Sequence, residues 1–524
     1  MKKIIQTLLG GAILILLPFA FTSCEDILGE WSKPAPAVSS VTKSTGNVCF
    51  ATTSLLRGSL DPSFTNALTL TGDGTVTYAS SDPAVATVDP ATGKVTPVAP
   101  GTATITATIS DSETYTYATK QASYTLELQE GYSYRSWDET EKKFVVNVAA
   151  SDGCELITST TIDNGKIHVV KGTVNITGDI YLNGTILNNI ILCDNSVLNI
   201  SGRLIVPSSY PRLIILAQSD SDDMGQLNVS SSTGSSGVGV IGISSDLEIH
   251  GGKITATALG SSPHMFGIQG KNITIYGGDI KAQGNEAGGS YSTSGILGSI
   301  SIAIHGGKVE AIGGDVASSS SSNAGHGISG RFTIDGDAVV IAKGGNASGT
   351  GNGGGHGIWN NNEASTIGGH AKVTLTGGNS SSLSPGAGME ITSATVTLKD
   401  YAQVTATGGD HLGTNYYGTA GIHNGYLTLQ DQASLTAIGG KSSGNINGVY
   451  GIASLNYYGG TFMATGGEKG PSAANDGNAI YNLYNQTTSN VTFEKRGDGE
   501  TWIPFDIAAG ANQSPTARYV RKAN

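Results

Sequence analysis

Residues 304–315, with the sequence IHGGKVEAIGGD, contain the pattern that decides the fold of most of this chain. Polar and apolar residues alternate from Lys308 to Ala311, and a double glycine stands on either side of residues 308–312. A short alternating segment between turn residues is typical of a β-strand that buries one face. The related string IHGGKITATA occupies residues 249–258. A strand of this kind is therefore repeated along the chain.

Two signals recur together around this strand. Several of the strands end in a double glycine, as at 313–314 and 466–467. A second signal, a glycine followed by an aliphatic residue, returns about once every 30 residues. A third short strand, such as 332–334, lies between the two. The aliphatic residues of the second signal are Ile243, Ile268, Ile296, Ile328, Ile358, Met389, Ile422 and Ile452.

Three short strands per repeat, with no segment of helical periodicity, predict a three-faced parallel β-helix in which each coil pairs with the next. The repeat length of roughly 30 residues suits such a solenoid, whereas a propeller blade needs a longer period of about 40–45 residues. We expect the aliphatic residues from Ile268 to Ile452 to form one inward column. The repeated glycines are expected where the chain turns tightly or adopts a positive φ.

An earlier all-β segment has a different character. Residues 75–78, 85–88 and 103–108 alternate between apolar and polar residues and are bounded by Gly, Pro, Asp or Ser. Short strands at this spacing predict a sandwich. The string TVTYASSDPAVATVDPATGKVTPVAPGTATITAT resembles the bacterial immunoglobulin-like group 2 domain over most of residues 46–128. That resemblance implies a spacer on a surface protein, although some relatives take part in adhesion.

The run IILCDNSVLNISGRLIV and the two IHGGK strings resemble a repeat of large surface proteins from gut bacteria. They also resemble, more loosely, β-helical carbohydrate-binding proteins. The resemblance covers roughly residues 130–520. It implies a right-handed parallel β-helix at the cell surface and, less directly, binding of a polysaccharide or host glycan.

The N-terminus has the pattern of a secretory signal. Lys2 and Lys3 precede a predominantly apolar stretch from Ile4 to Phe21, and small residues lead to Cys24. The cysteine resembles the lipobox of bacterial lipoproteins, which implies acylation of Cys24, membrane attachment through that lipid and an outer-membrane, surface-exposed location. Phe21 stands where the lipobox usually has Leu. An ordinary signal with a chance cysteine remains the alternative.

These patterns divide the chain into six segments. The segments are a signal peptide (1–23), a tether (24–45), the Ig-like domain (46–128), a linker or N-terminal cap (129–155), the β-helix (156–492) and a C-terminal cap (493–524).

The formal net charge of the chain is −12, which argues against a nucleic-acid partner because phosphates demand a basic face. Three cysteines other than Cys24 are present, namely Cys49, Cys154 and Cys193. A Cys154–Cys193 disulfide and unpaired buried thiols are both open alternatives.

Catalytic signals are weak. The segment Gly325-His326-Gly327-Ile328 resembles a motif of the polygalacturonases, but Asp222 and Asp223, the aspartate pair that would accompany it, lie more than one coil away. We instead expect His326 and His356 to stack inside the coil, partnered by Ser or Asn. The sequence thus predicts a non-catalytic protein. A β-helical polysaccharide hydrolase or lyase is the alternative.

Binding candidates fall into two groups. Asp220, Asp222 and Asp223 supply hard oxygen ligands in one loop, which makes a calcium site possible; no other cofactor is indicated. Exposed aromatic rings often mark binding sites because they offer apolar faces with a polar edge. We expect Tyr417, Tyr450 and Tyr481 to form a ladder of rings along one flank of the solenoid and to bind a glycan there. The full aromatic set is Trp359, Tyr416, Tyr417, Tyr450, Tyr457, Tyr458, Tyr481 and Tyr484.

Overall fold

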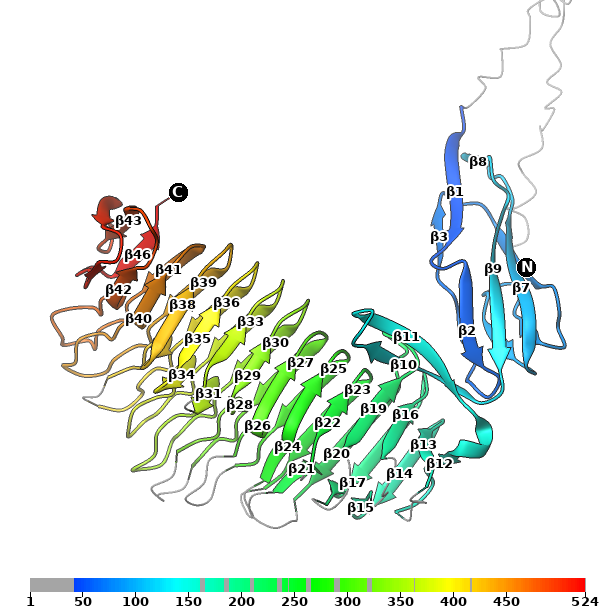
Figure 1. Cartoon of the computed structure of the whole chain (residues 1–524), viewed down its shortest axis with the longest axis horizontal. Helices are drawn as coiled ribbons and strands as arrows, with labels where there is room; N and C mark the ends of the chain where they lie inside the picture. Colours follow the sequence, from blue (N-terminus) through cyan, green and yellow to red (C-terminus); the bar gives the residue numbers. More distant parts are fainter. Residues whose placement is uncertain are drawn as a thin grey trace, which may run out of the picture.

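The computed structural model describes residues 42–160, 165–182, 188–207, 212–232, 238–243, 245–260, 265–286, 293–317, 323–361, 363–414 and 417–523. Within them the chain is all-β, with a sandwich followed by a long solenoid (Figure 1). The only helical segment in these ranges is a 3-10 turn at Ser151–Gly153. None of the described residues forms a helix suited to crossing a bilayer. The predicted signal and Cys24 lie outside the described residues.

The N-terminal domain is a sandwich of two main sheets. One sheet has the order β2-β9-β7-β4, the other has the order β3-β1-β8, and β5 and β6 form a small hairpin. Alternate residues of β7, including Ala103 and Ile105, are buried, while the threonines between them are not, as the alternation predicts. The strands are β1 (Ser44–Phe50), β2 (Ser54–Gly58), β3 (Leu68–Thr71), β4 (Val76–Ser80), β5 (Ala86–Val88), β6 (Val95–Pro97), β7 (Gly101–Ile109), β8 (Tyr115–Tyr117) and β9 (Gln121–Gln129).

Most coils of the solenoid have three strands, as predicted, and the period is about 29 residues; in some coils, such as that of Met265–Ile275, two of the three strands continue as one. One strand of every coil belongs to a 14-stranded sheet whose first eleven strands are parallel. These eleven are β14 (Thr173–Thr177), β17 (Val197–Ser201), β20 (Gln226–Ser231), β23 (Lys253–Ala258), β25 (Asp279–Gln283), β27 (Lys308–Ile312), β30 (Val339–Lys343), β33 (Lys372–Thr376), β36 (Gln403–Thr407), β39 (Ser434–Ile438) and β41 (Thr461–Thr465).

The other two strands of each coil join in one 23-stranded sheet, so the three faces form two continuous sheets. Its first members are β10 (Tyr132–Asp138), β11 (Lys143–Ala149), β12 (Cys154–Leu156), β13 (Ile167–Val170), β15 (Ile180–Tyr181), β16 (Asn189–Leu192), β18 (Leu204–Val206), β19 (Leu213–Ala217), β21 (Val238–Ile243), β22 (Leu247–Ile249), β24 (Met265–Ile275) and β26 (Ile296–Ile304). It continues through β28 (Ile328–Ser329), β29 (Phe332–Ile334), β31 (Ile358–Asn361), β32 (Ser365–Ile367), β34 (Met389–Thr392), β35 (Thr395–Leu398), β37 (Ile422–His423), β38 (Tyr426–Leu429), β40 (Ile452–Tyr457), β42 (Ile480–Asn485) and β45 (Asn512–Gln513).

The predicted inward column is confirmed from Ile268 to Ile452, each member being at most 1% exposed. The earliest occurrence of the glycine signal, at Ile243, is out of register with this column. Ile268 pairs instead with Ile241 of the preceding coil, and Gly242 pairs with Gln269. A shift of two residues keeps the same face of a strand buried, so the pattern alone does not detect it.

The repeated glycines have two different reasons. Glycines that precede a strand, such as Gly252, Gly278 and Gly307, have a positive φ, as expected. The double glycines that follow a strand, at 313–314, 344–345, 377–378, 408–409, 439–440 and 466–467, have no positive φ. A Cβ placed on Gly378 would overlap the carbonyl oxygen of Gly345 in the previous coil. The N–H of Gly378 also donates a hydrogen bond to the Gly355 carbonyl at 2.8 Å. These glycines therefore allow close backbone contact between coils.

The two ends of the solenoid are treated differently. The hairpin β10–β11 lies along the outside of the first coils, where Arg135 pairs with Ala217 and the Trp137 N–H donates to His250 Nδ1 at 2.8 Å (Figure 1). At the C-terminal end, β46 (Tyr519–Lys522) pairs antiparallel with β41, and β43 (Val491–Arg496) and β44 (Ile503–Ile507) extend the sheet. The antiparallel strands end the parallel ladder and so cap that edge.

Aromatic residues contribute to this cap. Phe505 packs on the fully buried Phe493 with ring centroids 5.8 Å apart. The guanidinium groups of Arg496 and Arg521 cover Trp502 and lie 5.0 and 4.2 Å from its ring.

Buried polar contacts fix the Ig-like domain to the solenoid. The Asp61 carboxylate is 6% exposed and accepts hydrogen bonds from the Ser133 N–H at 2.9 Å and from Gln218 Nε2 at 2.6 Å. Arg57 lies 3.5 Å from Asp194 of the first coils. Burial raises the pKa of Asp61 despite these hydrogen bonds. The predicted spacer is thus docked on the solenoid through specific contacts.

The three described cysteines, Cys49, Cys154 and Cys193, are all free. Cys193 is buried, and Cys154 packs in the same apolar cluster. Of the two alternatives, the structure has the unpaired thiols.

Candidate functional site

The predicted aromatic residues do not share one environment. Trp359, Tyr417 and Tyr450 line a pocket on the flank of the last coils. Tyr457 is buried in the cap core, and its hydroxyl donates to the Gly460 carbonyl at 3.0 Å. Tyr458, 52% exposed, occupies the turn between β40 and β41 and lines none of the described pockets. Tyr484 is half-buried on β42, and Tyr416 lies outside the described residues.

The expected ladder of equivalent tyrosines is wrong in register. Tyr481 follows Ile480, which pairs with Ile452, so Tyr481 is level with Ala453 rather than with Tyr450. Tyr481 is nevertheless 50% exposed, and its ring lies 4.9 Å from that of Tyr450. The tyrosines therefore gather on one flank without forming a regular file. Their spacing in the sequence is distorted by loops of different length.

The flank pocket, as we name it, has a volume of about 540 Å³ and spans several coils. One wall comes from adjacent positions of β31, β34 and β37, where Trp359 pairs with Glu390 and Glu390 pairs with His423. The rest of the lining comes mostly from residues that precede β34, β37 and β40. The complete lining is His356, Trp359, Ser384, Pro385, Glu390, Tyr417, Gly418, Thr419, Ala420, His423, Val449 and Tyr450.

Glu390 is the centre of the polar contacts in this pocket. The side chain is buried, with the residue 7% exposed, and its Oε2 accepts a hydrogen bond from His423 Nδ1 at 2.8 Å. Asn424 donates to the other oxygen. Burial raises the pKa of Glu390, but the hydrogen bond from His423 and the other partners lower it by more, and the net shift is downward. Glu390 is thus an ionised carboxylate near the pocket surface.

His356, which lines the pocket, stacks on His326 of the preceding coil. The rings of His326 and His356 are 5.0 Å apart with an interplanar angle of 20°, which confirms the predicted stack. Their partners are backbone groups, not Ser or Asn. The His356 N–H donates to His326 Nδ1 at 3.0 Å, and the Ala387 N–H donates to His356 Nδ1 at 2.8 Å. Each neutral ring consequently carries its proton on Nε2.

His356 was expected inside the coil. It is mostly buried, but its side chain is 21% exposed and lines the flank pocket. It precedes β31, which begins at Ile358, so the alternation of faces along a strand does not apply to it. Burial lowers the pKa of His356 to about 4, although the nearby Glu390 raises it. His356 is therefore a neutral hydrogen-bond donor at physiological pH.

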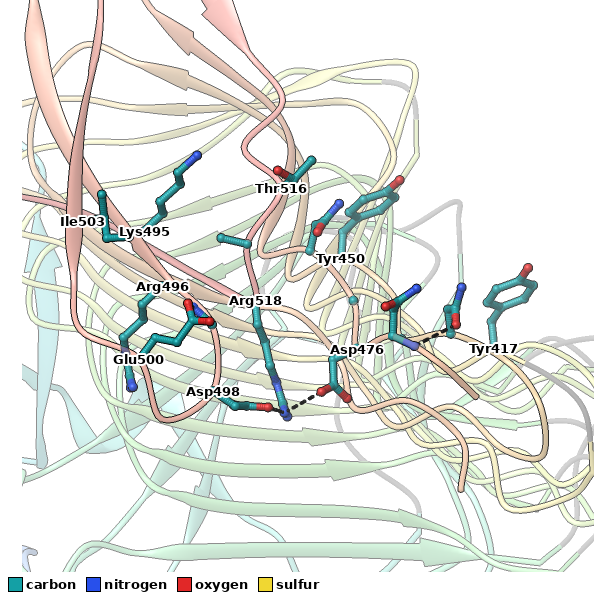
Figure 2. A pocket seen from close by; sticks show the side chains of 17 residues that line it. Tyr417, Tyr450, Asp476, Lys495, Arg496, Asp498, Glu500, Ile503, Thr516 and Arg518 are labelled. Atoms are coloured by element: carbon teal, nitrogen blue, oxygen red, sulfur yellow. Dashed lines mark hydrogen bonds and ion pairs between the residues drawn. The ribbon is translucent and has the colours of Figure 1, made fainter. Parts of the chain in front are cut away.

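A second pocket, the cap pocket, has a volume of about 690 Å³ and lies between the last coils and the C-terminal cap (Figure 2). Arg518 lies between Asp476, at 3.1 Å, and Asp498. The residues lining the cap pocket include Tyr417 and Tyr450, which also line the flank pocket. The two pockets therefore adjoin at Tyr417 and Tyr450, and we refer to them together as the groove.

The predicted calcium ligands are not gathered into a site. Asp220 forms an ion pair with Arg135 at 2.9 Å. Lys253 donates a hydrogen bond to the backbone carbonyl of Asp222. Among the described residues, no three His, Cys, Asp or Glu side chains are grouped so as to hold a metal ion. Calcium binding by Asp220, Asp222 and Asp223 stays a prediction that this geometry does not support.

Sequence reasoning missed the polar residues of the groove. Glu390 follows Trp359 by one coil, and His423 follows Glu390 by one coil, so each step equals the local repeat length. Counting forward one coil at a time from Trp359, the single tryptophan candidate, would have placed Glu390 and His423 at equivalent positions of the next two coils. Arg518 gave no such signal, because it lies beyond the last repeat.

Comparison with known proteins identifies one part of the chain. Residues 51–120 match the bacterial Ig-like domain (group 2), in agreement with the resemblance over residues 46–128. A search of curated proteins gives no match.

Proposed function

We propose that this protein is a non-catalytic cell-surface lipoprotein that binds an extended glycan in the groove formed by the flank pocket and the cap pocket. Acylated Cys24 would anchor it in the outer membrane, and the Ig-like domain would hold the solenoid away from the lipid. An Ig-like domain joined to a parallel solenoid fits such a surface or carbohydrate-binding role.

The observation that carries the proposal is the common lining of the two pockets. Tyr417 and Tyr450 belong to both, and Trp359 lines the flank pocket alone. From His356 to Tyr450 the groove crosses three coil steps of about 4.8 Å, or about 14 Å, enough for several sugar units. Aromatic faces bind the apolar C–H surfaces of sugars, while their edges and neighbouring polar groups meet hydroxyls.

Two tyrosine variants test the proposal. Binding would be measured by affinity electrophoresis and calorimetry with the Cys24→Ser chain, on polysaccharides first identified by a glycan array. Loss of both rings in Tyr417→Ala/Tyr450→Ala should cost about 1 kcal/mol per ring, or roughly 30-fold in Kd for the pair. Tyr458→Ala is the matched control, because Tyr458 is as exposed as Tyr417 but lies outside the groove. Equal retention of wild type and a folded double variant would contradict the groove.

One contact favours a second candidate function, cleavage of a polysaccharide. Glu390 Oε2 accepts a hydrogen bond from His423 Nδ1 at 2.8 Å, which orients an imidazole that lines the pocket. A carboxylate that orients an imidazole in this way suits general-base chemistry. Release of new reducing ends by the wild type, abolished by His423→Ala, would support an enzyme. Intact glycan chains after prolonged incubation would leave binding alone.

A further inference from the structure

The flank pocket combines aromatic rings with a single strong charge. Trp359, Tyr417 and Tyr450 supply the rings, and Glu390 supplies the carboxylate. No lysine or arginine is present among the described residues that line it. A positive group is attracted both by the faces of aromatic rings and by a carboxylate, whereas an anionic group is repelled by the carboxylate.

The carboxylate keeps capacity for a ligand. His423 and Asn424 each donate one hydrogen bond to Glu390, and an ionised carboxylate offers about four acceptor sites. Glu390 also has little access to water, since only 7% of the residue is exposed. Charge attraction at a site of low solvent exposure is screened less than at an open surface.

His356 does not cancel this charge in the way a lysine or arginine would. The Nδ1 of His356 accepts the Ala387 backbone N–H, so the ring is neutral when this hydrogen bond is present. His356 lines the pocket with its Nδ1 3.9 Å from the Glu390 carboxylate. His423 is fixed by its own hydrogen bond to Glu390 and is 45% exposed in its side chain, so it remains in contact with solvent.

From this arrangement we propose that the flank pocket selects a glycan whose sugar units carry a protonated amino group, with the ammonium bound between Glu390 and the rings of Trp359, Tyr417 and Tyr450. The inference rests on the proposed glycan-binding function and names the ligand class for the same groove. Free hexosamine units would be preferred over their N-acetylated forms. Uronate or sulfated units would be disfavoured.

The test uses two oligosaccharides that differ only in this charge. Glucosamine oligomers and N-acetylglucosamine oligomers of the same length and linkage would be titrated into the Cys24→Ser chain by calorimetry at pH 6, where the free amine is protonated. We expect the glucosamine oligomer to bind at least about tenfold more tightly at low salt, and the difference to shrink as salt is added.

Substitution at Glu390 identifies the source of that preference. Glu390→Gln keeps the shape of the side chain and removes its charge, so the tenfold preference should fall to about twofold or less. Retained binding of the N-acetylated oligomer would show that this variant is folded. Glu310→Gln is the matched control, since Glu310 lies on β27 of the other sheet and should leave the preference unchanged.

The outcomes separate this inference from the proposed function. Equal binding of the two oligomers, or a preference that Glu390→Gln leaves intact, would overturn the amino-sugar assignment. Retention of some other glycan, lost in Tyr417→Ala/Tyr450→Ala while neither oligomer binds, would also overturn it but would uphold the groove. Absence of binding to every glycan tested would overturn both.

Discussion

Val373 and Thr374 are adjacent residues of β33 that face opposite sides of the coil wall. Val373 is 2% exposed and belongs to the solenoid core, whereas Thr374 is exposed. The same substitution at the two positions, Val373→Asp and Thr374→Asp, therefore separates burial from every other property of the strand. The two variants have the same added charge and nearly the same place in the sequence.

The size of the effect follows from burial and proton uptake. Removing the buried Val373 side chain forfeits about 2 kcal/mol of apolar burial. An aspartate without a partner in this core takes up a proton, and at pH 7 that costs about 4 kcal/mol, because pH 7 lies about three units above the ordinary pKa of aspartate. The free energy of unfolding should thus fall by about 6 kcal/mol for Val373→Asp. For Thr374→Asp the change should be about 0.5 kcal/mol.

The pH dependence gives this prediction its sharpest form. The folded-state pKa of the buried aspartate is raised, so its penalty is present above the unfolded pKa and is relieved as the pH falls. Relative to wild type, Val373→Asp should regain most of the loss of about 4 kcal/mol between pH 7 and pH 4. Val373→Asn, which has no proton to gain, should show no such recovery. Unfolding by urea, followed by circular dichroism, measures each difference. Similar losses at both positions, or a loss for Val373→Asp that is the same at pH 4 and pH 7, would refute the assigned faces.

Three further predictions concern the coil contacts, the histidine at the pocket and the membrane anchor. Gly378→Ala should lower the thermal transition by several degrees because its Cβ meets a carbonyl oxygen of the previous coil, whereas Gly153→Ala, with no atom within 4 Å, should not. The folded-state pKa of His356 is lowered to about 4, so stability should decrease by about 3 kcal/mol as the pH falls from about 6.5 to 4. His356→Gln should flatten that part of the stability profile, and an unchanged slope would exclude His356 as its cause. A fatty-acid analogue supplied to cells should label the wild type but not Cys24→Ser, and equal labelling would remove the lipid anchor.

The sequence predicted the coil because burial acts at each strand separately. Alternation over a short strand, as in Lys308 to Ala311, identifies the inward face without knowledge of any partner strand. The repeat of that pattern then predicts a stack of coils. The same local logic explains the Ig-like sandwich, where Ala103 and Ile105 alternate with threonines.

The reason for the double glycines was only half accessible from the sequence. The pattern placed them at turns, but the close approach of Gly378 to Gly345 arises between coils. A similar limit applied to His356, which precedes its strand and so escapes the alternation that was used to place it.

Periodicity by itself therefore determined the strands, the inward residues and the all-β architecture of this protein. Tertiary structure decided the register between coils and, with it, the groove. Loops of unequal length make the separation of Trp359 and Glu390 differ from that of Glu390 and His423, yet strand pairing brings these three into one file. Hydrogen bonds between strands fix which residues are neighbours, and no local pattern in the chain records the length that each loop takes up. The candidate site is consequently a property of the stack of coils, while the core is a property of each strand.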